Sequence, residues 1–194
     1  MNTSIKIFCL LVALTLSLQT SAQQKIEKEY RIKASMVPKQ AVDFIQECFP
    51  DTKVKWYKEE GNSTYFLEAK LRFGGYLYSI KFNTDGTLLD TEYIISFNQI
   101  PDQARLKIEN HLKERFTSFS IKKVQVQWLA DETTTKKLID KVKVSDLKFT
   151  TNFEIEVRGK HQSQVEFYEF LFSSKGELLK EYTIIQRNPN NLIF

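Results

Sequence analysis

The sequence predicts an α+β protein, a tandem repeat of one helix plus a four-stranded antiparallel sheet, with the helices packed on one face. The main observation is a duplicated segment, because residues 76–95 return as residues 166–185 at a constant offset. Each copy has two apolar, aromatic-rich runs around a glycine, which is the pattern of a β-hairpin. The motifs at 37–38 and 100–101, an aliphatic residue followed by proline, indicate that the duplication includes a helix before the strands.

The first 22 residues have the pattern of a secretory signal peptide. Lys6 is their only charged side chain, residues 7–18 form an apolar run, and small residues at 20–22 precede a polar pair. The apolar run is shorter than the roughly 20 residues that a membrane-spanning helix needs. We therefore expect cleavage after Ala22 and a periplasmic or secreted protein with no membrane span after cleavage.

Composition limits the function classes of the remaining chain. Residues 23–194 suffice for one or two small domains, and their single cysteine, Cys48, excludes an internal disulfide. The 28 basic and 24 acidic residues of the whole sequence are interspersed, which predicts a solvated surface and no nucleic-acid partner. Stability must therefore come from a hydrophobic core, for which 15 phenylalanines, 8 tyrosines and 2 tryptophans supply the material.

The first repeat is expected at residues 23–97. After a charged lead-in, Pro38 occupies the first position of a helix whose apolar stripe is Ala41, Phe44, Ile45, Cys48 and Phe49. Strands follow at 54–57 and 65–73, and then the hairpin. Apolar residues in the strand 65–73 alternate with Glu68, Lys70 and Arg72, so one face is expected to cover the core and the other to meet water.

The second repeat is expected at residues 98–194. Its helix extends to about Phe116 and places Ala104, Ile108 and Leu112 on one face. The second copy is longer than the first mainly because of residues 131–147, a segment rich in threonine, lysine and aspartate. We expect a long strand connection there, with one helical turn at 136–142, and loops of this length usually have a function.

The order and pattern of these elements resemble a known family. The residues that carry the resemblance lie at 37–44, 53–56, 76–80 and 85–89 in the first copy, and at 100–101, 126–128 and 175–179 in the second. On these residues the chain resembles the PepSY-like exported proteins of Bacteroidetes-type bacteria, whose fold is similar to β-lactamase-inhibitor protein (BLIP). The resemblance implies a periplasmic or secreted protein without catalytic residues, whose distant relatives include propeptide domains and inhibitors that bind hydrolases.

Two repeats side by side would form one eight-stranded sheet with an open, partly aromatic face opposite the helices. The candidates for partner binding on this face are apolar residues that are out of phase with the core side of their strands: Tyr57, Phe66, Leu77, Phe167 and Leu171. We expect a non-catalytic binding protein that holds an unidentified protein partner on this face, in the manner of an inhibitor or chaperone. The alternative is a small molecule or lipid bound in a cleft between the two repeats.

The sequence offers little for catalysis, metals or cofactors. A calcium-like loop at 81–92 begins with Lys81, a cation where the first carboxylate ligand is needed, so its glycine is better explained by the hairpin turn. Two histidines, His111 and His161, are too few for a zinc site, and Cys48 belongs to an apolar helix face. We therefore expect no enzyme activity, no metal and no cofactor.

Overall fold

The structure, a computed structural model, describes residues 23–26, 28–60, 65–141 and 147–186, so the predicted signal peptide lies outside the described residues. The strands are β1 (Gln23–Ile26), β2 (Lys28–Ile32), β3 (Lys55–Glu60), β4 (Tyr65–Phe73), β5 (Tyr76–Phe82), β6 (Leu88–Ile94), β7 (Ser118–Leu129), β8 (Thr150–His161), β9 (Gln164–Ser173) and β10 (Leu178–Gln186). The helices are α2 (Lys39–Cys48), α3 (Asp102–Arg115) and α4 (Glu132–Ile139).

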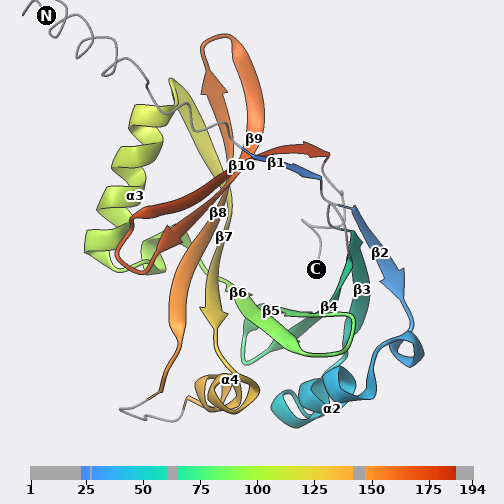
Figure 1. Cartoon of the computed structure of the whole chain (residues 1–194). Helices are drawn as coiled ribbons and strands as arrows, with labels where there is room; N and C mark the ends of the chain where they lie inside the picture. The colour runs from blue at the N-terminus through green and yellow to red at the C-terminus, as the bar shows by residue number, and fades with distance from the viewer. Residues whose placement is uncertain (1–22, 27, 61–64, 142–146, 187–194) are drawn as a thin grey trace, which may run out of the picture.

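The described strands form one ten-stranded sheet in the order β1-β10-β9-β8-β7-β6-β5-β4-β3-β2. Every neighbouring pair is antiparallel except β1 and β10, and the three helices cover the outer face (Figure 1). The α+β class is confirmed. The expected count of eight strands was wrong, because the charged lead-in contributes β1 and β2 to the two edges. Pairing of β6 with β7 makes the sheet continuous, and duplication of one unit stays a prediction.

Two core clusters lie between the sheet and the helices, one under α2 and one under α3. The predicted apolar stripes are confirmed, since α2 buries Ala41, Phe44, Ile45 and Cys48, and α3 buries Ala104, Ile108 and Leu112. Pro38 and Pro101 are N-caps, so the first helix begins one residue later than expected. Proline has no N–H to leave unpaired, which suits this position as well as the first helical one.

The segment expected as a long connection contains a complete short helix, α4, which begins earlier than the single turn expected at 136–142. The side chain of Asp131 caps it by accepting a hydrogen bond from the Thr134 amide at 2.7 Å. Ile139 is buried in the core under α2, and Glu132 accepts a hydrogen bond from Gln40 at 2.9 Å. An insertion in the second half of the chain therefore completes the core of the first half.

The sheet curls until its two edges are close together. Strand β1 is the edge next to β10 and β2 is the edge next to β3, yet β1 ends at Ile26 and β2 begins at Lys28. Two residue steps span at most about 7 Å, so the two edges must approach to that distance at this point. The face opposite the helices is therefore concave and laterally enclosed, where the sequence predicted an open surface (Figure 1).

Candidate functional site

Strand alternation gathers charged side chains on the concave face. In β4, Leu67 and Ala69 belong to the core, so Glu68 and Lys70 point to the opposite side. Both are only 6% exposed, which corrects the expectation that this side of β4 meets water. They are buried because the curled sheet surrounds them. The sequence pattern alone could not show this, since alternating charge is equally typical of a solvated strand.

The register of the sheet continues this pattern across both halves of the chain. Lys81 on β5 lies opposite Glu68 on one side and Asp90 on the other. In the next row Glu92 on β6 lies between Ser79 and Gln127. The following row places Glu154 of β8 between Gln125 of β7 and Leu171 of β9. Polar side chains from at least five adjacent strands therefore face one another.

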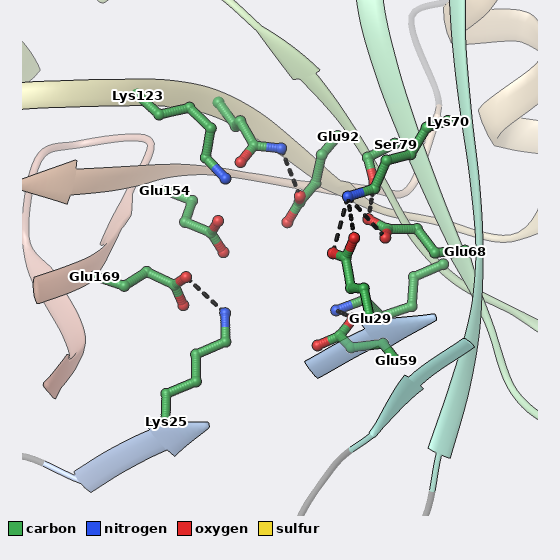
Figure 2. Close-up of a pocket in the computed structure, with 12 residues that line it drawn as sticks. Lys25, Glu29, Glu59, Glu68, Lys70, Ser79, Glu92, Lys123, Glu154 and Glu169 are labelled. Atoms are coloured by element: carbon green, nitrogen blue, oxygen red, sulfur yellow. Dashed lines mark hydrogen bonds and ion pairs between the residues drawn. The ribbon is translucent and has the colours of Figure 1, made fainter. Parts of the chain in front are cut away.

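These side chains line two adjacent cavities that share several residues, among them Glu59, Lys81 and Glu154. The inner cavity has a volume of about 40 Å³, and Figure 2 shows the glutamates and lysines around it. The larger cavity has a volume of about 470 Å³ and adds apolar side chains to its lining. The apolar residues of the larger cavity are Phe66, Leu89, Leu171 and Tyr182.

Ion pairs attach both edge strands to the concave face. Lys25 of β1 lies 2.6 Å from Glu169 of β9. On the other edge, Lys70 lies 2.8 Å from Glu29 of β2 and 3.1 Å from Glu68 (Figure 2). Burial raises the pKa of Glu29 to about 7, assisted by the charge of Glu68 and opposed by Lys70. The two strands that were missed in the sequence are thus held by charge as well as by backbone pairing.

The other two lysines of the inner cavity are paired as well. Lys81 lies 2.7 Å from Glu59, and Lys123 forms an ion pair with Glu156. Burial alone would lower the pKa of both lysines, but the surrounding carboxylates raise it instead. Both therefore stay charged.

Three carboxylates of this face have no ion pair with a lysine or arginine in the part of the chain that the structure describes: Asp90, Glu92 and Glu154. Burial raises the pKa of Asp90 to about 6, although Lys81 lowers it. Burial and the charge of Asp90 raise the pKa of Glu92 to about 8. Burial, Glu169 and Glu92 raise the pKa of Glu154 well above its ordinary value.

All five residues predicted for partner binding lie half-buried on strands of the sheet, and Phe66 and Leu171 meet at the larger cavity. The Phe66 ring lies 5.8 Å from the Lys81 ammonium, and the Tyr57 ring 5.2 Å from that of Lys70. Leu77 and Phe167 line neither of the two cavities. The ionic residues around the cavities were missed. Their only signal in the sequence was charge on alternate positions of several strands.

Cys48 and the two histidines, the residues that the sequence offered for nucleophilic catalysis or metal binding, lie apart from this site. Cys48 is buried under α2, and burial raises the pKa of its thiol to about 12. His111 packs edge-on against Phe170 and Phe172 in the other core cluster, and His161 is exposed at the end of β8. Among the described residues, no cluster of histidine, cysteine, aspartate and glutamate has the arrangement of a metal site. No described helix has the length and apolarity to cross a membrane.

No family model and no curated protein sequence matches this chain. Solved structures do match. A BLIP-like protein of Bacteroides fragilis superposes with a TM-score of 0.50 at 19% identity, over 78% of this chain and 90% of that one. The chain has a BLIP-like fold. A DUF2874 family protein of Bacteroides ovatus matches with a TM-score of 0.53 at 13% identity, over 81% and 97% of the two chains.

A third match to this BLIP-like chain is a protein of Bacteroides eggerthii that is described as periplasmic. It superposes with a TM-score of 0.53 at 14% identity, over 81% of this chain and 99% of that one. The resemblance predicted from the sequence is therefore confirmed for the fold. At such identities the matches establish architecture alone, and the function has to be argued from the concave face.

Proposed function

We propose that this BLIP-like chain is a non-catalytic, exported binding protein whose ligand enters the concave face. The observation that carries the proposal is the larger cavity, whose volume of about 470 Å³ is typical of small-molecule sites. Its mixed lining combines apolar contact area with several charged groups. Buried carboxylates without a cationic partner are costly for stability, and strongly perturbed pKa values cluster at functional sites.

Two further observations support the exported and non-catalytic parts of the proposal. The signal-peptide pattern at residues 1–22 and the periplasmic description of the Bacteroides eggerthii match favour export. A thiol whose pKa is raised to about 12 is a poor nucleophile, and Cys48 lies in one core cluster whereas His111 packs against Phe170 of the other. We infer that the site binds its ligand without transforming it.

The enclosure of the concave face limits what can bind there. The edge strands β1 and β2 approach each other at Ile26 and Lys28, which restricts the access of a folded domain to this face. The larger cavity has the volume that a small molecule needs. That cavity is lined by Phe66 and Asp90 from the first half of the chain and by Glu154 and Leu171 from the second. Side chains from both halves of the chain at one cavity support the binding of a small ligand between them.

The test compares two tryptophan substitutions. Leu171→Trp would fill part of the larger cavity, whereas Leu179→Trp adds the same side chain at a position that is 51% exposed. Protein purified from its own host would be analysed by native mass spectrometry. We expect a co-purifying ligand on the wild type and on Leu179→Trp, and its loss from Leu171→Trp. Equal retention by the two variants would place the ligand elsewhere and contradict the proposal.

A protein partner that inserts a narrow segment is the second candidate. Three of the predicted contact residues are half-buried but lie outside the lining of the larger cavity: Tyr57, Leu77 and Phe167. A partner segment that extends beyond the cavity would contact them. The test is the double substitution Leu77→Glu with Phe167→Glu, followed by crosslinking and mass spectrometry. Loss of a crosslinked partner without loss of a small ligand would favour the inserted segment. The reverse result would favour the small molecule.

A further inference from the structure

The described residues that line the inner cavity include six glutamates and only four lysines. Its four lysines, Lys25, Lys70, Lys81 and Lys123, are all engaged in ion pairs with other glutamates of the sheet. Glu92 and Glu154 also line it, and neither has an ion pair with a lysine or arginine among the residues described. This excess is local, since the whole chain carries a formal net charge of +4.

An independent feature of the same cavity is an unsatisfied hydrogen-bond acceptor. Gln125 is only 5% exposed and lines the inner cavity, where its Nε2 donates to Glu92 at 2.7 Å. Its Oε1 has no hydrogen-bond partner within the described part of the chain. Gln125 lies directly opposite Glu154 in the β7–β8 register. A buried acceptor without a donor is costly, so a ligand group rich in N–H donors is favoured next to this oxygen and its acidic neighbours.

We propose that the concave cavity binds an alkylammonium or guanidinium group, held by the carboxylates of Glu92 and Glu154 and by the amide oxygen of Gln125. Such groups carry a positive charge and three to five N–H donors. Charge-assisted hydrogen bonds of this kind are stronger than neutral ones. This inference rests on the proposed function, because it names the ligand chemistry of the same site.

A nitrogen cation fits these acceptors better than a metal ion does. Calcium or magnesium needs several oxygens converging within about 2.0–2.6 Å of one point. No cluster of acidic residues in the described segments has that arrangement. An ammonium or guanidinium group spans a greater distance, because its donors point in different directions. The two carboxylates and the amide oxygen can therefore each accept from a different N–H.

The larger cavity supplies a place for the carbon chain that carries the cation. It shares Glu154 with the inner cavity and adds the apolar side chains of Phe66, Leu89 and Leu171. An alkyl stem in contact with these residues would be removed from water, which favours binding. A butyl chain with a terminal cation therefore matches both the charged end and the apolar wall of the site.

The experiment is isothermal titration calorimetry of the purified chain with small probes that all carry a four-carbon alkyl chain. Butylamine and butylguanidine are the cationic probes, butanol and butyrate are the neutral and anionic ones, and calcium chloride tests a metal. A short acetylated peptide with one central lysine represents a partner's side chain, so that free amines and inserted segments are distinguished. We expect saturable binding of at least one cationic probe and none of butanol, butyrate or calcium.

Three variants assign the binding to the proposed atoms. Glu92→Gln and Glu154→Gln should each weaken binding of the cationic probe at least about tenfold, because each removes a charge-assisted acceptor. Gln125→Leu should weaken it without changing the charge of the cavity. Glu114→Gln, an exposed substitution on α3, is the matched control and should bind like the wild type. Unchanged backbone NMR spectra outside the cavity would show that each variant is folded.

Three results would overturn the inference: equal binding of butanol and butylamine, binding unaffected by both glutamate substitutions, or saturable binding of calcium that Gln125→Leu abolishes. Failure of this inference is distinguishable from failure of the proposed function. A neutral or anionic ligand that is lost from Leu171→Trp would leave the concave site in place and reject only the cation. Retention of every ligand by Leu171→Trp would reject the site itself.

Discussion

Glu92 illustrates at the scale of one residue how the curled sheet changes the chemistry of a side chain. Its carboxylate accepts hydrogen bonds from Gln125 at 2.7 Å and from Gln127 at 3.3 Å. Burial and Asp90 raise its pKa to about 8, while Lys81, Lys123 and Lys25 act in the opposite direction. Near neutral pH the Glu92 carboxyl group is therefore partly neutral and partly ionised, so its charge can respond to a bound cation.

Without ligand, the raised pKa of Glu92 should make the protein less stable as the pH rises. A carboxyl group whose folded pKa exceeds its unfolded value, ordinarily about 4.3, stabilises the fold at low pH and loses this contribution as pH rises through the folded pKa. We expect the stability of Glu92→Gln, which cannot ionise, to rise relative to that of the wild type between about pH 4 and pH 8 and to differ by a constant amount above pH 8. Urea unfolding across this range measures the difference, with Glu114→Gln as the control. A pH-independent difference would contradict the expectation.

At the scale of elements, the duplicated hairpins meet the helices through their glycines. Gly86 and Gly176 both have positive φ, at 93° and 77°, as the turn pattern predicted. A Cβ at Gly86 would lie 2.9 Å from the Cβ of Pro38, and one at Gly176 would lie 2.5 Å from the carbonyl oxygen of Ala104. The glycine of each turn is therefore required for two reasons: the turn needs a positive φ, and a side chain there would collide with the start of a helix.

A pair of alanine substitutions separates these two requirements. Gly75 has a positive φ of 87° but no atom within 4 Å of an added Cβ, so Gly75→Ala should cost only the conformational strain, about 1–2 kcal/mol. Gly176→Ala should cost about 1–3 kcal/mol more, because the hairpin must move away from α3. Chemical unfolding of both variants tests this. Similar losses for the two would show that the contact with the helix is unimportant.

The success of the sequence predictions also depended on the scale of the feature. Helical stripes and hairpin turns were predictable because they follow from local periodicity and from glycine. Strands β1 and β2 were missed because residues 23–32 are mostly polar, and their pairing is set by distant partners such as Glu169 and Lys70. The ionic cavity was missed for the same reason. Whether Glu68 meets water or a cavity depends on the curvature of the whole sheet.

Over the whole molecule, ion pairs at the two edges help to keep the sheet curled, and Lys70 is the most buried of them. It pairs with Glu29 on the edge strand β2 and with Glu68, and all three side chains are at most 8% exposed. Removing one partner of a buried ion pair leaves an uncompensated charge, which costs about 3–5 kcal/mol. The cost should depend on pH, because protonation of Glu29 relieves it.

We expect Lys70→Met to lose about 3–5 kcal/mol of unfolding free energy near pH 8 and less than half of that near pH 5. Burial and Glu68 already raise the pKa of Glu29 to about 7, and loss of Lys70 removes the charge that lowers it. In the variant the folded pKa of Glu29 then lies further above its unfolded value, so stability falls as pH rises. Lys39→Met is the control, since its ion pair with Asp43 is exposed and worth about 1 kcal/mol or less. Equal losses at the two pH values would show that Lys70 acts by packing instead of by charge, and the ionic closure of the sheet would have to be abandoned.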